Sequence, residues 1–253
     1  MLRIRYIIIV LLPLIVSAQG LVERQTGSRN FLVHHNPSVP GETVQRIIEQ
    51  LESDYQEFRH YFNLTVPGRT SVFIHNDMSS FQSATLAYHY ETATVYNDEI
   101  HLAPLSHIRA SATLSSVITQ QAIRLVLYSR RMNGCPRWLY EGASAYFAGI
   151  HRLQAPPGHL SVQRPSDLDE IFAHAHNEAE FVNGIYVAAL SFKSILERYG
   201  EAHTVTLLRL FNGEFVYEEA VPYSLGVTLE RFERQWRRDV ETLLTEFREN
   251  RGR

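Results

Sequence analysis

The side chains best suited to chemistry in this chain are a scattered set of histidines and one glutamate, Glu141, which lies in a dense run of aromatic and small residues. His174 and His176 are close enough in sequence to share a metal, but the polar, irregular stretch around them favours an exposed loop. The single cysteine, Cys135, excludes an internal disulfide. The sequence has no glycine-rich phosphate loop and no Gly-x-Ser-x-Gly motif, so the functional argument rests on the region around Glu141.

The run around Glu141 reads Pro136-Arg137-Trp138-Leu139-Tyr140-Glu141-Gly142-Ala143-Ser144-Ala145-Tyr146-Phe147. It resembles the helix that carries the third zinc ligand in gluzincin metallopeptidases, especially the peptidase MA-like domain proteins. Their pattern has a proline, then Trp-Leu, then Glu-Gly, a small residue and an aromatic pair. The resemblance implies that Glu141 occupies the position that completes the zinc site. It also implies that the small residues let this helix pack closely on the helix before it.

In that family the preceding helix carries His-Glu-x-x-His, in which two histidines bind zinc and the glutamate is the general base. Here the same place reads Gln120-Gln121-Ala122-Ile123-Arg124. The resemblance therefore gives the two other metal positions to Gln120 and Arg124, and the base position to Gln121. An amide is a poor zinc ligand and a poor base, and a guanidinium stays protonated. The sequence predicts that zinc hydrolysis at this site is lost.

In the family both positions face the metal, so the resemblance implies that two residues of opposite charge, Arg124 and Glu141, face each other here. A lone buried carboxylate is costly, and a guanidinium can neutralise it through hydrogen bonds, so we expect the two side chains to be in direct contact. Gln120 or Gln121 should fill the remaining hydrogen bonds. No cofactor is expected here, although active relatives use zinc.

Weaker parts of the resemblance lie on both sides of this region. The segment 186–200 is similar to the helix after the third ligand, and Tyr186 is matched to a tyrosine that steadies the oxyanion in gluzincin aminopeptidases. The segment 99–103 resembles the sheet-edge strand along which substrates lie, and 226–236 resembles the closing helix of the family. Altogether the similarity covers residues 30–245.

Hydrophobic periodicity predicts the elements that position these residues. Alternation and turn signals predict short strands, at 31–34, 70–75, 94–96 and 99–102, the last two joined by a turn at Asn97-Asp98. Helical periods predict helices at 44–62, 79–86, 112–128 and 136–148. A proline-rich loop is expected at 151–165, and after it only helices, at 181–199, 201–211 and 228–247.

This order predicts an α+β fold, with a small mixed sheet packed on central helices and an all-helical C-terminal part. The resemblance makes it a gluzincin-like metallopeptidase domain over residues 19–253. Residues 1–18 are different: a basic start, an apolar run and small residues up to Ala18 are typical of a secretory signal peptide. We therefore expect an exported protein, periplasmic or secreted, cleaved after Ala18. The alternative is an uncleaved N-terminal anchor.

The net charge of −3, without a basic patch, argues against a nucleic-acid-binding protein. No membrane attachment is expected once the signal segment is removed. The leading hypothesis is a catalytically inactive pseudopeptidase that binds a peptide or protein in its cleft, or acts as a scaffold. Two alternatives remain open. One is an active zinc-dependent hydrolase whose metal is held by Glu141 with His101, His107 or the 174–176 pair, and the other is an exported structural protein without a functional cleft.

Overall fold

The computed structural model of the protein describes residues 23–63, 68–111, 113–128, 134–153, 162–211 and 215–251. The predicted signal peptide at 1–18 and most of the predicted loop at 151–165 lie outside these residues.

The described strands form one mixed sheet of five strands in the order β1-β2-β3-β5-β4. The bounds are Arg24–Gly27 for β1, Phe31–His35 for β2, Thr70–Ile74 for β3, Ala93–Tyr96 for β4 and Glu99–Leu102 for β5. The three inner strands run parallel, and each edge strand is antiparallel to its neighbour. The four predicted strands are confirmed. The sequence analysis missed β1, because this polar edge strand has no apolar alternation and is defined by its pairing with β2.

The tight hairpin between β4 and β5 decides which strand lies at the edge of the sheet. Asn97 and Asp98 both adopt positive φ angles of 52° and 62°, which suits the two-residue turn that matches the twist of the sheet. This turn folds β4 back along β5, so β5 lies between β3 and β4. The expectation that 99–103 forms the sheet edge is therefore wrong, and β4 takes that place.

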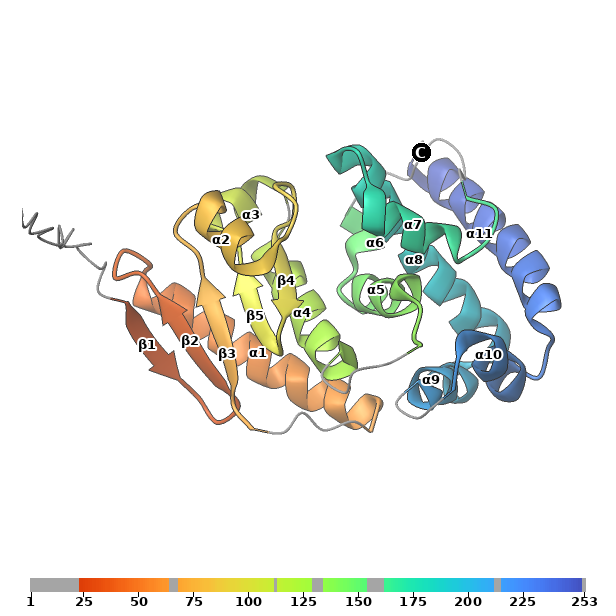
Figure 1. The fold of residues 1–253 in the computed structure, drawn as a ribbon, viewed down its shortest axis with the longest axis horizontal. Helices are drawn as coiled ribbons and strands as arrows, with labels where there is room; N and C mark the ends of the chain where they lie inside the picture. The colour runs from red at the N-terminus through yellow and green to blue at the C-terminus, as the bar shows by residue number, and fades with distance from the viewer. Residues whose placement is uncertain are drawn as a thin grey trace, which may run out of the picture.

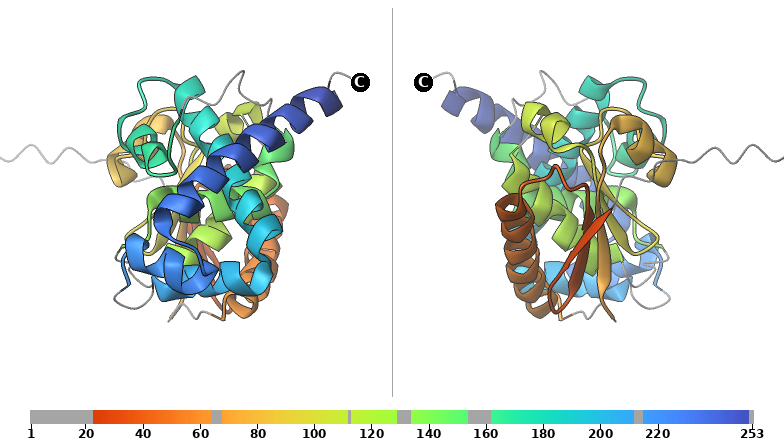
Figure 2. Two further views of the ribbon diagram at one scale, coloured as in Figure 1. Left: turned by 90° about the vertical axis from the view of Figure 1, so that its right-hand side faces the viewer. Right: turned by 90° about the vertical axis from the view of Figure 1, so that its left-hand side faces the viewer.

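The first long helices cover one face of the sheet, and the helices that follow later in the chain form a second, helical body (Figure 1). Their bounds are Gly41–Tyr61 (α1), Met78–Thr85 (α2), Leu105–Ser111 (α3), Leu114–Tyr128 (α4), Arg137–Phe147 (α5), Ile150–Leu153 (α6), Asp167–His174 (α7), Glu178–Tyr199 (α8), Glu201–Leu210 (α9), Tyr217–Leu225 (α10) and Leu229–Arg251 (α11). α1 and α4 pack together under the sheet, and Figure 2 shows α1 on one side of the sheet and α2 on the other. The predicted α+β order, mixed first and helical afterwards, is confirmed.

Two details of the C-terminal half differ from the prediction. The short helix α6 covers the start of the segment predicted to be a loop, and α7 and α10 are additional helices. α7 is stabilised by its place beside α5: the Asp169 carboxylate accepts a 2.6 Å hydrogen bond from the backbone N–H of Trp138, in the first turn of α5. Burial raises the pKa of Asp169 to about 6, and the Trp138 N–H and the charge of Arg137 oppose this rise.

The helix α8 is the centre of the helical body. By length and composition alone it is apolar enough to cross a membrane, but 67% of its most apolar window is buried inside the fold, as in the core helix of a globular protein. It packs along α5, α7, α9 and α11. α5 in turn packs against α4, so α5 joins the helical body to the sheet.

The close approach of α5 and α8 depends on Gly142. A Cβ atom at this position would lie 2.3 Å from the backbone carbonyl oxygen of Ala188, a separation that the two helices cannot accommodate without moving apart. The expectation that the small residues of this segment serve the preceding helix is therefore wrong for Gly142, which faces α8, the later helix.

We expect Gly142→Ala to destabilise the protein by about 1–3 kcal/mol, because the added methyl group overpacks a backbone contact. Gly41→Ala is the matched control, since a Cβ there meets nothing within 4 Å. Urea denaturation followed by circular dichroism measures both variants. Equal midpoints for the two would contradict the close contact.

Candidate functional site

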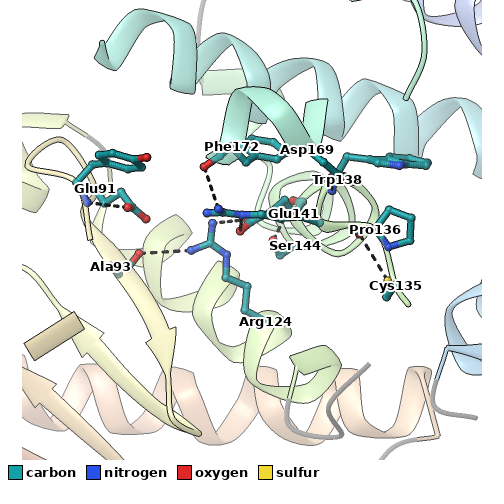
Figure 3. Close-up of polar contacts among 12 residues, drawn as sticks. Glu91, Ala93, Arg124, Cys135, Pro136, Trp138, Glu141, Ser144, Asp169 and Phe172 are labelled. Atoms are coloured by element: carbon teal, nitrogen blue, oxygen red, sulfur yellow. Dashed lines mark hydrogen bonds and ion pairs between the residues drawn. The ribbon is translucent and has the colours of Figure 1, made fainter. Parts of the chain in front are cut away.

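The predicted contact between Arg124 and Glu141 is confirmed. Nη2 of Arg124 on α4 donates a hydrogen bond to Oε2 of Glu141 on α5, and the side chains form an ion pair. Both residues are buried, with 7% of Arg124 and 4% of Glu141 exposed. Figure 3 shows the Arg124 guanidinium between Glu141 and the carbonyl group of Ala93.

The Arg124 guanidinium connects three elements of the fold. Its Nη1 donates to the Ala93 carbonyl oxygen on β4 at 3.3 Å and, at 3.4 Å, to Oε1 of Gln121 one helical turn earlier on α4. With Glu141 on α5, the acceptors come from the edge strand and from both central helices. Gln121 thus supplies the hydrogen bond expected of Gln120 or Gln121, while Gln120 is buried on the same helix.

A second arginine faces the other oxygen of Glu141. Arg137 Nε lies 3.7 Å from Glu141 Oε1, and Arg137 Nη1 donates a 2.9 Å hydrogen bond to the Phe172 carbonyl oxygen on α7. The Arg137 guanidinium also lies over the Phe172 ring, 5.4 Å from its centroid. Both carboxylate oxygens of Glu141 therefore face positive charge.

Glu91 adds a second carboxylate that the sequence analysis did not identify. It lies just before β4, is 9% exposed, and its Oε1 accepts a 2.9 Å hydrogen bond from the Tyr88 N–H. Burial raises the pKa of Glu91; the Glu141 charge adds to the rise, whereas the Tyr88 N–H, Arg124 and Arg137 oppose it. Figure 3 shows Glu91 pointing toward the Arg124–Glu141 pair. No sequence signal marks Glu91, because it lies in an irregular segment between a predicted helix and a predicted strand.

Tyr186 lies on a different side of α8. It is fully buried, and its ring packs at a steep angle on Phe247 of α11, with the centroids 6.4 Å apart. The side of α8 that meets Gly142 of α5 is marked by Ala188 and Phe192. At about 100° per residue, Tyr186 is roughly 200° and 240° away from these two positions. The oxyanion role that the resemblance gives to Tyr186 stays a prediction.

The histidines of the displaced-metal alternative lie on three separate elements. His101 is on β5 and forms a hydrogen bond with His75, His107 is on α3, and His174 is an exposed residue at the end of α7, two positions before His176. In the part of the chain that the structure describes, no three His, Cys, Asp or Glu side chains are grouped so that they could hold a metal ion.

The residues at the three family-equivalent metal positions do not fit zinc. Gln120 offers an amide, Arg124 a permanent positive charge, and only Glu141 a ligand of the type that zinc prefers. That carboxylate already faces two guanidinium groups. A metal would have to displace Arg124 from a buried ion pair, so we derive no metal chemistry at this site.

Comparison with models of known protein families, and with curated protein sequences, finds no significant match. The resemblance to gluzincin proteins therefore rests on the residue patterns of the sequence alone, chiefly that around Glu141.

Removal of one partner of the central pair should be strongly destabilising. We expect Glu141→Gln to lower the free energy of unfolding by about 3–5 kcal/mol, because it leaves the buried Arg124 charge without a counter-charge. Arg124→Met should cost less, since Arg137 remains beside Glu141. Chemical denaturation at neutral pH measures both variants.

The control is Arg234→Gln on α11, which breaks an exposed ion pair with Glu230 and should change stability by about 0–1 kcal/mol. A Glu141→Gln variant as stable as this control would mean that the central pair contributes no more than a surface pair.

Proposed function

We propose that this chain is a gluzincin-like protein of the peptidase MA type that has lost metal catalysis and acts by binding a peptide or protein. The single observation that carries the proposal is the buried ion pair between Arg124 and Glu141. In the family, both positions face the metal, and contact between them here is what a metal-free version of the same backbone would produce. The guanidinium supplies the positive charge that zinc supplies in active relatives.

The sheet edge beside the pair supports a binding role. The backbone N–H of Ala103 donates to the Thr92 carbonyl oxygen, so the backbone groups of Thr92 point toward the strand β5. This direction alternates along an antiparallel strand, so Ala93 and Val95 direct their backbone N–H and C=O groups away from β5. Arg124 holds the Ala93 carbonyl group, which leaves Val95 as the residue of β4 able to pair with an extended peptide. We propose that the partner is such a peptide segment rather than a nucleic acid or a membrane. Export through a signal peptide is part of the proposal.

A peptide-library screen with the purified protein, residues 19–253, tests the binding role. We expect extended peptides to bind, and Val95→Pro to weaken binding at least tenfold, because proline removes the outward N–H group while an edge strand tolerates it. Fluorescence polarisation measures affinity, and circular dichroism checks folding. Failure of all peptides to bind would favour the structural-protein alternative, and unchanged binding by a folded Val95→Pro variant would place the peptide elsewhere.

A rescue experiment tests the family assignment. The triple change Gln120→His, Gln121→Glu and Arg124→His writes His-Glu-x-x-His into α4, with Glu141 as third ligand and an open position for water. We expect this variant to bind zinc at least 100-fold more tightly than the parent, as measured by competition with a chelating dye. Peptidase activity should be recovered only in part, because groups that orient the ligands typically contribute 10–100-fold.

The single change Gln121→Glu is the matched control and should not raise zinc affinity, since a base has no activated water without a metal. A folded triple variant that binds zinc no better than the parent would contradict the gluzincin assignment. A parent protein that keeps one zinc per chain after dialysis, with chelator-sensitive proteolysis, would instead support the active-hydrolase alternative.

A further inference from the structure

Three aromatic rings form a ladder on the outer face of the sheet. His34, Phe73 and His101 lie opposite one another on β2, β3 and β5 in the register of the parallel strands. The ring centroids are 4.5 Å apart between His34 and Phe73, and 5.0 Å apart between Phe73 and His101, with the planes tilted by 18° and 16°. Phe73 is therefore stacked between two imidazole rings.

His75, the residue after β3 and two positions after Phe73, also contacts His101. Its Nε2 lies 3.0 Å from Nδ1 of His101, while the ring centroids are 5.3 Å apart and the planes differ by 20°. The centroid separation exceeds the N···N distance by about twice the distance from the centre of an imidazole ring to its nitrogen. The two nitrogens thus lie on the line between the ring centres and point at each other.

This head-on geometry is that of a hydrogen bond with one shared proton. One nitrogen must carry the hydrogen and the other must accept it, because a neutral imidazole has one donor and one acceptor nitrogen. If the two histidines bound one metal ion, the lone pair of each nitrogen would instead point at the metal and not at the other nitrogen. One added proton leaves a nitrogen that can still accept, so the hydrogen bond survives; protonation of both rings would place two N–H groups, each on a positively charged ring, against each other.

Burial around the pair favours the neutral form. His101 is 5% exposed, and its Nε2 has no hydrogen-bond partner among the described residues; Glu99 Oε2 lies 3.6 Å away. Burial lowers the pKa of His101. Burial also lowers the pKa of His75, the charge of His101 lowers it further, and the carboxylates of Asp77 and Glu23 only partly oppose this.

His75 connects the pair to the helix α2. Its ring meets that of Phe81 at 68°, with the centroids 5.6 Å apart, and Phe81 is the fully buried residue by which α2 packs on the sheet. Asp77, two residues after His75, caps α2 by accepting a 2.8 Å hydrogen bond from the Ser80 N–H. α2 leads directly into the segment that carries Glu91 and β4. The other ionisable group in the ladder, His34, lies 3.8 Å from Glu23 and faces Phe73 rather than an imidazole.

We propose that the His75–His101 pair is a proton-sensitive latch that holds α2 on the sheet and opens when both imidazoles are protonated. The folded state keeps both imidazoles neutral, with one N–H donated to the other ring, whereas in the unfolded chain both take up protons near the ordinary histidine pKa of about 6.5. The stabilisation is therefore fully present above that pH and is lost as the pH falls through the lowered values of the folded state. Acid releases α2, and with it the support of the segment that leads to Glu91 and β4.

Histidine titration by NMR tests the shared proton. In His101→Phe, which keeps a ring stacked on Phe73, burial still lowers the pKa of His75, but this pKa should rise relative to the wild type because the charge of His101 is gone. His34→Phe is the matched control, since it changes the other ring that stacks on Phe73 and should leave the pKa of His75 unchanged. A His75 pKa that does not move in His101→Phe would overturn the proposal.

Amide hydrogen exchange, corrected for its intrinsic pH dependence, tests the latch. In the wild-type protein the protection of residues 78–85 should fall at least tenfold between about pH 8 and about pH 5, with smaller changes in α1. In the double variant His75→Phe/His101→Phe this difference should disappear. Protection of α2 that is independent of pH in the wild type, or equally dependent on pH in the double variant, would overturn the latch. These outcomes do not depend on peptide or zinc binding, so the test is separate from that of the proposed function.

Discussion

The buried ion pair between Arg124 and Glu141 is the constraint on which the middle of this structure depends. Two charges that leave water lose several kcal/mol of solvation each, and the loss is offset only when every charged atom finds partners. Here Nη1 and Nη2 of Arg124 find partners on β4, α4 and α5, while its buried Nε has no hydrogen-bond partner among the described residues. Arg137 adds a contact to α7. The electrostatic requirement of one pair therefore fixes the relative positions of the sheet edge and the helical body.

The residue pattern from Pro136 to Phe147 is explained by packing, independently of catalysis. Trp138 and Leu139 are fully buried, Gly142 permits the approach of α8, and the first turn is held by Asp169. Most of the pattern thus serves the packing of α5 between α4 and α8. Glu141 is the exception, because its buried carboxylate pairs with Arg124.

Burial also makes Asp169 and the His75–His101 pair respond to pH in opposite directions. In the helical half, Asp169 has a raised pKa, so its neutral form is favoured in the folded state, and the stability it contributes is lost as the pH rises through about 6. On the sheet, His75 and His101 have lowered pKa values, so their contribution is lost as the pH falls. Removal from water favours the uncharged form in both cases. The direction in which stability changes with pH differs because Asp169 is an acid and the two histidines are bases.

The sequence by itself determined the strands at β2 to β5, the long helices α1, α4, α5 and α8, and the absence of zinc ligands at 120 and 124. These features depend on side-chain types and on periods of two or 3.6 residues, which are properties of neighbours in the chain. The contact between Arg124 and Glu141 was expected from the resemblance to the gluzincin helices, in which both positions face the metal, and the structure has this contact. Only the tertiary structure decided that β4 is the edge, that Gly142 faces α8, and that Ala93, Glu91 and Arg137 join the ion pair. The pairing of His75 with His101 likewise depends on the register of β3 and β5. Such contacts join segments that are far apart in sequence, and their geometry is set by packing, which no local pattern encodes.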